Sequence, residues 1–156
     1  MSPRTRTRNT IWRCYMPDRL FLKVWGHCYN PLTLHIDPSI HFQVRVEGPL
    51  DFAAIDMILD TGATLVTIPT SVANDLGYSL YQPENMQYLT TPSGIVHAPI
   101  NTLISVEGLG VAATGIRAAC IDMPGSMTFA GLLGLSFLRN FDVDLHFRSG
   151  VIRFNS

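Results

Sequence analysis

The sequence predicts an all-β fold, either a sandwich or a barrel, on two observations. Short apolar segments follow one another between residues 40 and 154, separated by glycine and proline, which is typical of sheets built from short strands and tight turns. Only two short segments have the pattern of a helix. The chain has 156 residues, 47% of them hydrophobic and 15% charged, which suits a single domain with a substantial core.

The predicted strands begin at residue 40. Residues 40–47 alternate apolar and polar side chains, the period of a half-buried strand. Gly48-Pro49 predicts a turn, and residues 52–59 return as an increasingly apolar strand that leads to Asp60.

The remaining elements follow the same short rhythm. Residues 71–77 predict a helix closed by glycine, and a second helix is predicted around residues 136–140. Further strands are predicted at residues 65–68, 86–91, 95–100, 103–107, 110–113 and 116–121, with a closing hairpin of residues 141–147 and 151–154.

The N-terminal part differs from the rest of the chain. Its apolar residues show no sustained period, and residues 1–23 hold six basic side chains against the single acid Asp18, although the whole chain has a net charge of −1. A basic arm can contact nucleic acid or an anionic membrane surface, but no aromatic platform or basic stripe continues into the domain. We therefore expect a basic, poorly ordered extension at residues 1–37, a domain at residues 38–156 and no nucleic-acid partner.

Composition also limits the location and the cofactors. The three cysteines cannot all pair with one another, and no Cys/His spacing typical of a zinc site is present. This pattern fits a reducing compartment. No run of 18 apolar residues and no secretory segment occurs, so we expect a cytoplasmic protein with no membrane span, metal or cofactor. The cysteines are Cys14, Cys28 and Cys120.

The most informative segment is Asp60-Thr61-Gly62. An apolar strand delivers a carboxylate into a tight turn, and a second apolar strand leaves it. Gly62 can bring its N–H close to the carboxylate without a side chain in the way, and Thr61 supplies a hydroxyl that donates and accepts hydrogen bonds. Because the triplet by itself also occurs in ordinary turns, its flanks decide the interpretation.

Three segments resemble the aspartic peptidases, in particular the single-domain, bacterial-type members of the retropepsin-like group. Residues 57–69 place apolar side chains before Asp-Thr-Gly-Ala-Thr and an apolar strand ending in proline after it. Residues 131–141 resemble the family's hydrophobic-hydrophobic-glycine element and helix, and residues 89–97 resemble its flap, a glycine-tipped hairpin. The resemblance implies a small closed β-barrel of the retropepsin type with one short C-terminal helix.

The resemblance also implies a homodimer, because the chemistry needs two carboxylates and this chain has one Asp-Thr-Gly. The two Asp60 carboxyl groups would share one proton, one acting as general base on a water and the other as general acid toward the scissile carbonyl of a peptide or protein. Thr61 would lock the two turns together. Many pepsin-like enzymes place a hydroxyl against the carboxylate where Ala63 stands, so we expect activity at weakly acidic rather than strongly acidic pH.

The flap implied by the resemblance would close over a bound peptide and exclude bulk water. The residues expected to contact substrate are Ala63, Ser93, Gly94, Ile95 and Val96.

Two other functions fit parts of the sequence. A catalytically idle dimeric module would keep this fold to bind peptides or to self-associate, although such a module has no need for Asp60 at a strand end. An acid–base hydrolase acting on glycosides, for instance, would take both carboxylates from one chain. Asp122 lacks a following Thr-Gly turn, so we expect it to cap a loop, and we expect His97 to be an exposed hairpin residue.

Overall fold

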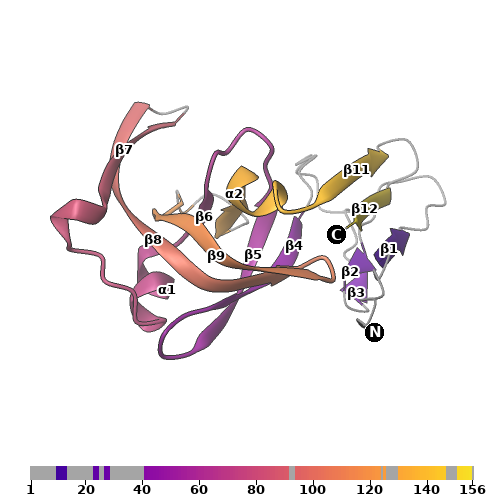
Figure 1. The fold of residues 1–156 in the computed structure, drawn as a ribbon, viewed down its shortest axis with the longest axis horizontal. Coiled ribbons are helices and arrows are strands. Elements are labelled where there is room, and N and C mark those ends of the chain that lie inside the picture. Colours follow the sequence, from indigo (N-terminus) through magenta and orange to yellow (C-terminus); the bar gives the residue numbers. More distant parts are fainter. Residues whose placement is uncertain are drawn as a thin grey trace, which may run out of the picture.

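Six strands of the described chain close into a barrel (Figure 1). The computed structural model describes residues 10–13, 23–24, 27–28, 41–91, 94–123, 125, 130–146 and 151–155. The strands of the barrel, in their spatial order, are β4 (His41–Glu47), β5 (Phe52–Leu59), β10 (Gly131–Leu133), β6 (Val66–Ile68), β9 (Val111–Cys120) and β8 (Gly94–Gly108), and β8 pairs with β4 to close the ring.

β10, a strand from late in the sequence, completes the barrel beside the turn that follows β5. β10 lies between β5 and β6, parallel to β5 and antiparallel to β6. Its Leu133 pairs with Leu59, the last residue of β5. The turn that joins β5 to β6, residues 60–65, is therefore backed by a segment some 70 residues further along the chain.

The alternation read from the sequence produces the core. Along β4 the side chains of Phe42, Val44 and Val46 are buried, whereas Gln43 and Arg45 between them are exposed. Removing each large apolar side chain from water stabilises the fold by about 1.5–3 kcal/mol. The largest fully buried side chains are those of Phe137, Phe154, Met57, Ile68, Leu76, Leu103, Leu133, Val44, Val46, Val66, Val106 and Cys120.

Two further groups of strands extend the barrel. β7 (Met86–Thr91) forms a hairpin with the first part of β8, and this hairpin projects from the barrel at the upper left of Figure 1. At the other end β12 (Val151–Asn155) lies between β11 (Asp142–His146) and β1 (Thr10–Arg13), antiparallel to both. A two-stranded pair is formed by β2 (Lys23–Val24) and β3 (His27–Cys28).

The rings of three phenylalanines join the β11–β12 sheet to the barrel. Phe141 lies 5.2 Å from Phe137, centroid to centroid, and 5.8 Å from Phe154, edge-on to the second ring. Phe137 belongs to α2 (Leu135–Leu138), the helix that follows β10. Edge-to-face contacts of this kind stabilise packing beyond the area that they bury.

The described helices are short. α1 (Thr70–Asp75) ends before Gly77, which has a positive φ of 85°, as predicted for a helix closed by glycine. A single 3-10 turn, η1 (Pro83–Asn85), precedes β7. No helix in the described part of the chain has the length and apolar character that a membrane crossing requires.

Several sequence predictions need correction. The strands predicted at 95–100 and 103–107 are one strand, β8, and those predicted at 110–113 and 116–121 are one strand, β9. The resemblance implied a single C-terminal helix, and the barrel also carries α1, which confirms the helix predicted at residues 71–77. A further strand, β1, was not predicted, and it pairs along β12. The closed all-β barrel of the retropepsin type is confirmed.

Candidate active site

The turn between β5 and β6, residues 60–65, holds the carboxylate of Asp60 at the end of β5, a strand in which Ile55 and Met57 are buried. The Gly62 N–H donates to Oδ1 of Asp60 at 2.8 Å, and the Asp60 N–H donates to the carbonyl of Leu133 at 3.2 Å. A Cβ on Gly62 would lie 3.2 Å from the same Oδ1, so glycine permits this close approach. Within the described residues the Gly62 N–H is the one donor on the carboxylate, which leaves Oδ2 open to a proton, a water or another carboxyl group.

The segment from β10 into α2 supports this turn from behind. The Leu135 N–H donates to the Ala63 carbonyl at 2.8 Å, and the Ser136 N–H donates to the Thr64 carbonyl at 3.0 Å. A Cβ on Gly134 would lie 2.7 Å from the Ala63 carbonyl oxygen and would overlap the Leu65 carbonyl, so a side chain is excluded there. Residues 133–136 therefore pack behind the turn.

Ser136 adds side-chain bonds to this backbone support. Its Oγ accepts the Val66 N–H at 2.8 Å and donates to the Arg117 carbonyl at 2.7 Å. The side chain is buried. Ser136 was not predicted as a site residue, and its one signal in the sequence is a lone hydroxyl in an otherwise apolar run.

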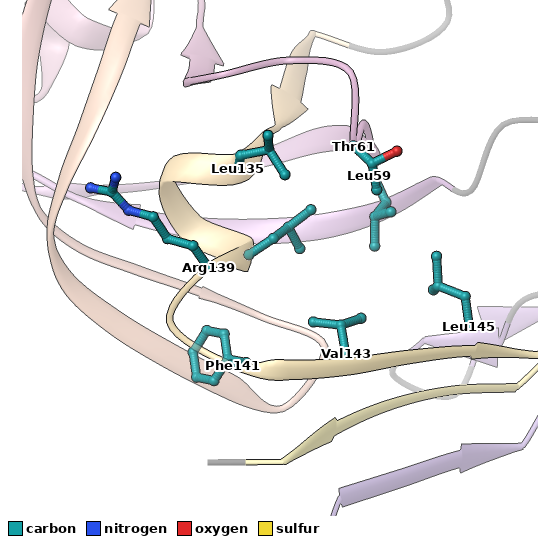
Figure 2. Close-up of a pocket in the computed structure, with 8 residues that line it drawn as sticks. Leu59, Thr61, Leu135, Arg139, Phe141, Val143 and Leu145 are labelled. Carbon is teal, nitrogen blue, oxygen red and sulfur yellow. The ribbon is translucent and has the colours of Figure 1, made fainter.

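An apolar hollow of about 230 Å³ opens beside the turn. Figure 2 shows Leu135 of α2 facing Val143 and Leu145 of β11 across it, with Leu59 and Thr61 at one end. None of the described residues that line the hollow is acidic. They are Leu59, Thr61, Leu135, Leu138, Arg139, Phe141, Val143 and Leu145.

The hairpin of β7 and β8 has two different faces, because successive strand residues point to opposite sides. Val96 is half-buried and shares its face with buried Ala98. Ile95 is 74% exposed and lies on the other face with Tyr88 and His97, whose rings stack at 4.4 Å. Ile95 and Val96, which sequence analysis grouped, therefore point in opposite directions. His97 is an exposed hairpin residue, as predicted.

The tip of this hairpin is set by Thr91 and Gly94. They form its last cross-strand pair, and the Thr91 hydroxyl donates to the Gly94 carbonyl at 2.8 Å. Ser93, predicted to contact substrate, lies outside the described residues. Figure 1 shows the hairpin projecting on the side of the barrel from which the turn after β5 also rises.

Asp122 is engaged elsewhere and does not join Asp60. Its carboxylate accepts the N–H of Thr70 at 2.9 Å and the Thr70 hydroxyl at 2.5 Å, so it caps the first turn of α1. The prediction of a capping role is confirmed, with a helix in place of a loop. No cluster of three or more metal-ligating side chains occurs among the described residues.

These features define a class of protein. A strand-end aspartate in a glycine turn, a hydrophobic-hydrophobic-glycine strand behind it and a small closed barrel with a projecting hairpin are features of the retropepsin-like fold. The family model described as "gag-polyprotein putative aspartyl protease" matches residues 43–140. The chain belongs to this retropepsin-like aspartyl protease family.

Solved structures share the fold. A retropepsin-like aspartic protease from Rickettsia conorii superposes with a TM-score of 0.59 at 18% sequence identity, over 99% of this chain and 96% of that one. The EIAV protease in complex with the inhibitor HBY-793 superposes with a TM-score of 0.50 at 21% identity, over 70% of this chain and 93% of that one. No curated protein matches the sequence.

Proposed function

We propose that this chain is an aspartic endopeptidase that cleaves peptide bonds as a homodimer, with one Asp60 carboxyl group from each copy acting on a bound water. The observation that carries the proposal is the Asp60 turn. Its carboxylate is fixed by the Gly62 N–H at 2.8 Å and is half-buried, yet Oδ2 has no hydrogen-bond partner among the described residues. A carboxyl group that is held on one oxygen and open on the other can exchange a proton with a bound water or with a second carboxyl group.

The second carboxyl group has to come from another copy. The chain has one Asp-Thr-Gly, Asp122 is occupied by Thr70, and the hollow beside Thr61 contains no acid. This argues against a hydrolase whose two carboxylates lie in one chain. Two carboxyl groups a few ångströms apart do not both ionise easily, so the pair retains one proton and supplies an acid and a base together.

The apolar hollow supports the same assembly. It adjoins Thr61 and is lined mostly by leucine, valine and phenylalanine, and Leu135 at its edge is 41% exposed. An exposed apolar surface of this kind marks a site of association. A two-fold axis beside the Asp60 turn would place both hollows in one interface and bring the two Thr61 hydroxyls together.

The chemistry then follows from the pair. The ionised carboxyl group takes a proton from the water while the water oxygen attacks the carbonyl carbon of the peptide bond. The protonated carboxyl group donates its proton to the carbonyl oxygen. Transfer of a proton to the amide nitrogen then allows the C–N bond to break. Ala63, within the turn, offers no hydroxyl that favours the charged form of the carboxyl group, so we expect the highest rate at weakly acidic pH.

The hairpin supplies the proposed substrate contacts at Ser93, Gly94, Ile95 and Val96. Val96 lies on the half-buried face that continues into the barrel, and Ile95 is on the exposed face. We therefore expect Val96 to contact substrate side chains when the hairpin closes, and Ile95 to contact the peptide only at the tip.

The test compares the wild type with Asp60→Asn, which keeps the shape of the side chain and removes its acid–base chemistry. Both proteins are incubated with a proteome-derived peptide mixture between about pH 4 and 7, a range chosen to span carboxyl titration. Products are read by mass spectrometry, and assembly is measured by sedimentation. Cleavage by the wild type alone, in proportion to its dimer fraction, is the expected result.

Two outcomes would change the proposal. If both proteins form well-folded dimers and neither cleaves any peptide, a catalytically idle module that binds peptides or self-associates would be favoured. Cleavage by a monomeric wild type would revive a hydrolase with both carboxylates in one chain. Repeating the assay without residues 1–37 separates an idle module from an enzyme restrained by its N-terminal extension.

A further inference from the structure

We infer that Ser136 is a positioning residue for Asp60, holding the exit of the Asp60 turn against the barrel. This inference rests on the proposed peptidase function and adds a residue that does not touch the substrate. Ser136 is 4% exposed. Its hydroxyl is not an activated nucleophile, because no acidic or basic side chain of the described residues contacts it.

The residue joins three segments that are distant in the sequence. Its N–H donates to the Thr64 carbonyl at 3.0 Å. Its hydroxyl accepts from the N–H of Val66, which opens β6, at 2.8 Å. The same hydroxyl donates to the carbonyl of Arg117 in β9 at 2.7 Å. The backbone N–H of Ser136 thus holds the end of the turn, and its side chain links the first residue of β6 to β9.

A smaller side chain cannot provide this support. Val66 is completely buried, so water does not reach its N–H while the barrel is closed. Alanine at position 136 would leave the Val66 N–H without its acceptor and the Arg117 carbonyl without the serine donor. An unsatisfied buried group is costly, and residues 64–66 would have to move to recover a partner.

Such a movement would reach the carboxylate. The Asp60 turn is held at its start by the bond from Asp60 to the Leu133 carbonyl and at its end by Ser136. The proposed pair needs its two carboxyl groups at a fixed separation, and a misplacement of about 1 Å can reduce a rate roughly 100-fold. Peptide binding by the hairpin does not involve Ser136, so the loss should fall on kcat and spare KM.

Tyr78 offers a matched control on the barrel wall. Its hydroxyl also bridges two backbone groups, donating to the Glu47 carbonyl at 2.8 Å and accepting the Ile104 N–H at 2.9 Å. Ser136→Ala and Tyr78→Phe therefore remove the same kind of bridge, one beside Asp60 and one in another part of the barrel. Ser136→Thr keeps the hydroxyl at the first site.

Kinetics with the full-length dimer separate positioning from general stability. Per folded dimer, Ser136→Ala is expected to lower kcat by about 10- to 100-fold with KM within about twofold. Tyr78→Phe is expected to keep the wild-type kcat, and Ser136→Thr to recover most of it. Equal kcat losses in Ser136→Ala and Tyr78→Phe would overturn the inference.

Hydrogen exchange gives a readout that does not depend on peptidase activity. Ser136→Ala should raise amide exchange in peptides covering residues 60–66 by at least about tenfold, the signature of local opening, whereas Tyr78→Phe should leave these peptides unchanged. Unchanged exchange at residues 60–66 in Ser136→Ala would overturn the positioning role. If Ser136→Ala exchanges faster at residues 60–66 but the wild type cleaves no peptide, Ser136 still holds the turn, and the peptidase proposal is overturned instead.

Discussion

Asp122 caps α1 by accepting hydrogen bonds from the N–H and the hydroxyl of Thr70, at 2.9 and 2.5 Å. The residue that precedes the helix, Pro69, makes no side-chain cap. The first N–H groups of a helix have no partner within it. Asp122, two residues after β9, therefore supplies an acceptor for the N–H of Thr70. The contact ties the segment after β6 to the segment after β9.

Replacing this cap should destabilise the protein without altering its chemistry. We expect Asp122→Ala to lower the free energy of unfolding by about 0.5–2 kcal/mol, the usual value of a helix cap, as measured by urea denaturation. Asp75→Ala is the matched control, because Asp75 is an exposed acid at the opposite end of α1. Its removal should be neutral or slightly stabilising, since an acid is unfavourable at a helix C-terminus. Equal stability of Asp122→Ala and wild type would contradict the capping role.

Gly134 should be the least replaceable residue behind the Asp60 turn. Its Cβ would overlap the Leu65 carbonyl and lie 2.7 Å from that of Ala63. We expect Gly134→Ala to lower the free energy of unfolding by at least about 2 kcal/mol, in the range of overpacked cores, and to abolish cleavage. Gly125→Ala is the control, because a Cβ there meets nothing within 4 Å. A thermal unfolding midpoint shared by the two variants would show that the turn can move aside.

Strands whose position is set by their own sequence pattern could be predicted. β7 spans Met86–Thr91, as predicted from its own residues, and β4 follows the period-2 alternation. β8 was predicted as two strands separated at residues 101–102, and in the structure its alternation breaks there because Ile100 and Asn101 are both buried. The break arises where the strand passes from the hairpin into the barrel and Asn101 is covered by Ser79, whose carbonyl accepts its amide at 3.2 Å.

Contacts between distant segments could not be predicted in the same way. The Asp60 turn was found from its sequence, and the glycine element behind it from a family resemblance. The lone hydroxyl of Ser136 did not reveal its role, because that role depends on Val66 and Arg117 lying beside it in the fold. β1 was missed for a similar reason, since its partner β12 is near the other end of the chain.

The apolar hollow should be an interface between copies. We expect Leu135→Glu to place a charge in it, to weaken dimerisation by at least about tenfold, the cost of burying an unpaired charge, and to make cleavage depend steeply on protein concentration. The helix itself should tolerate the change, because an acid is favourable in its first turn. Ile104→Glu is the control, since Ile104 is 46% exposed against 41% for Leu135 and lies outside the hollow. Sedimentation showing the same dimer affinity for both variants would place the interface elsewhere.

A buried thiol and a buried phenol should limit the stability of the fold at alkaline pH. Burial raises the pKa of the Cys120 thiol above its ordinary value of 9.0, although a hydrogen bond from Asn101 opposes the shift. Burial likewise raises the pKa of Tyr78 above 10.0, against the opposing bond from the Ile104 N–H. The folded state therefore holds both protons more tightly than the unfolded state does. Stability is complete below the ordinary values and is lost as the pH rises above them.

The measurement is the free energy of unfolding in urea at a series of pH values from about 7.5 to 10.5, which brackets both ordinary values. We expect the wild type to lose stability from about pH 9 upward. Tyr78→Phe and Cys120→Ala should each lose less over the same range, because each removes one ionisation that favours the unfolded chain. Tyr81→Phe is the control, since Tyr81 is 91% exposed, and it should follow the wild type. Identical pH slopes for Tyr78→Phe and wild type would show that burial of this hydroxyl does not couple its ionisation to folding.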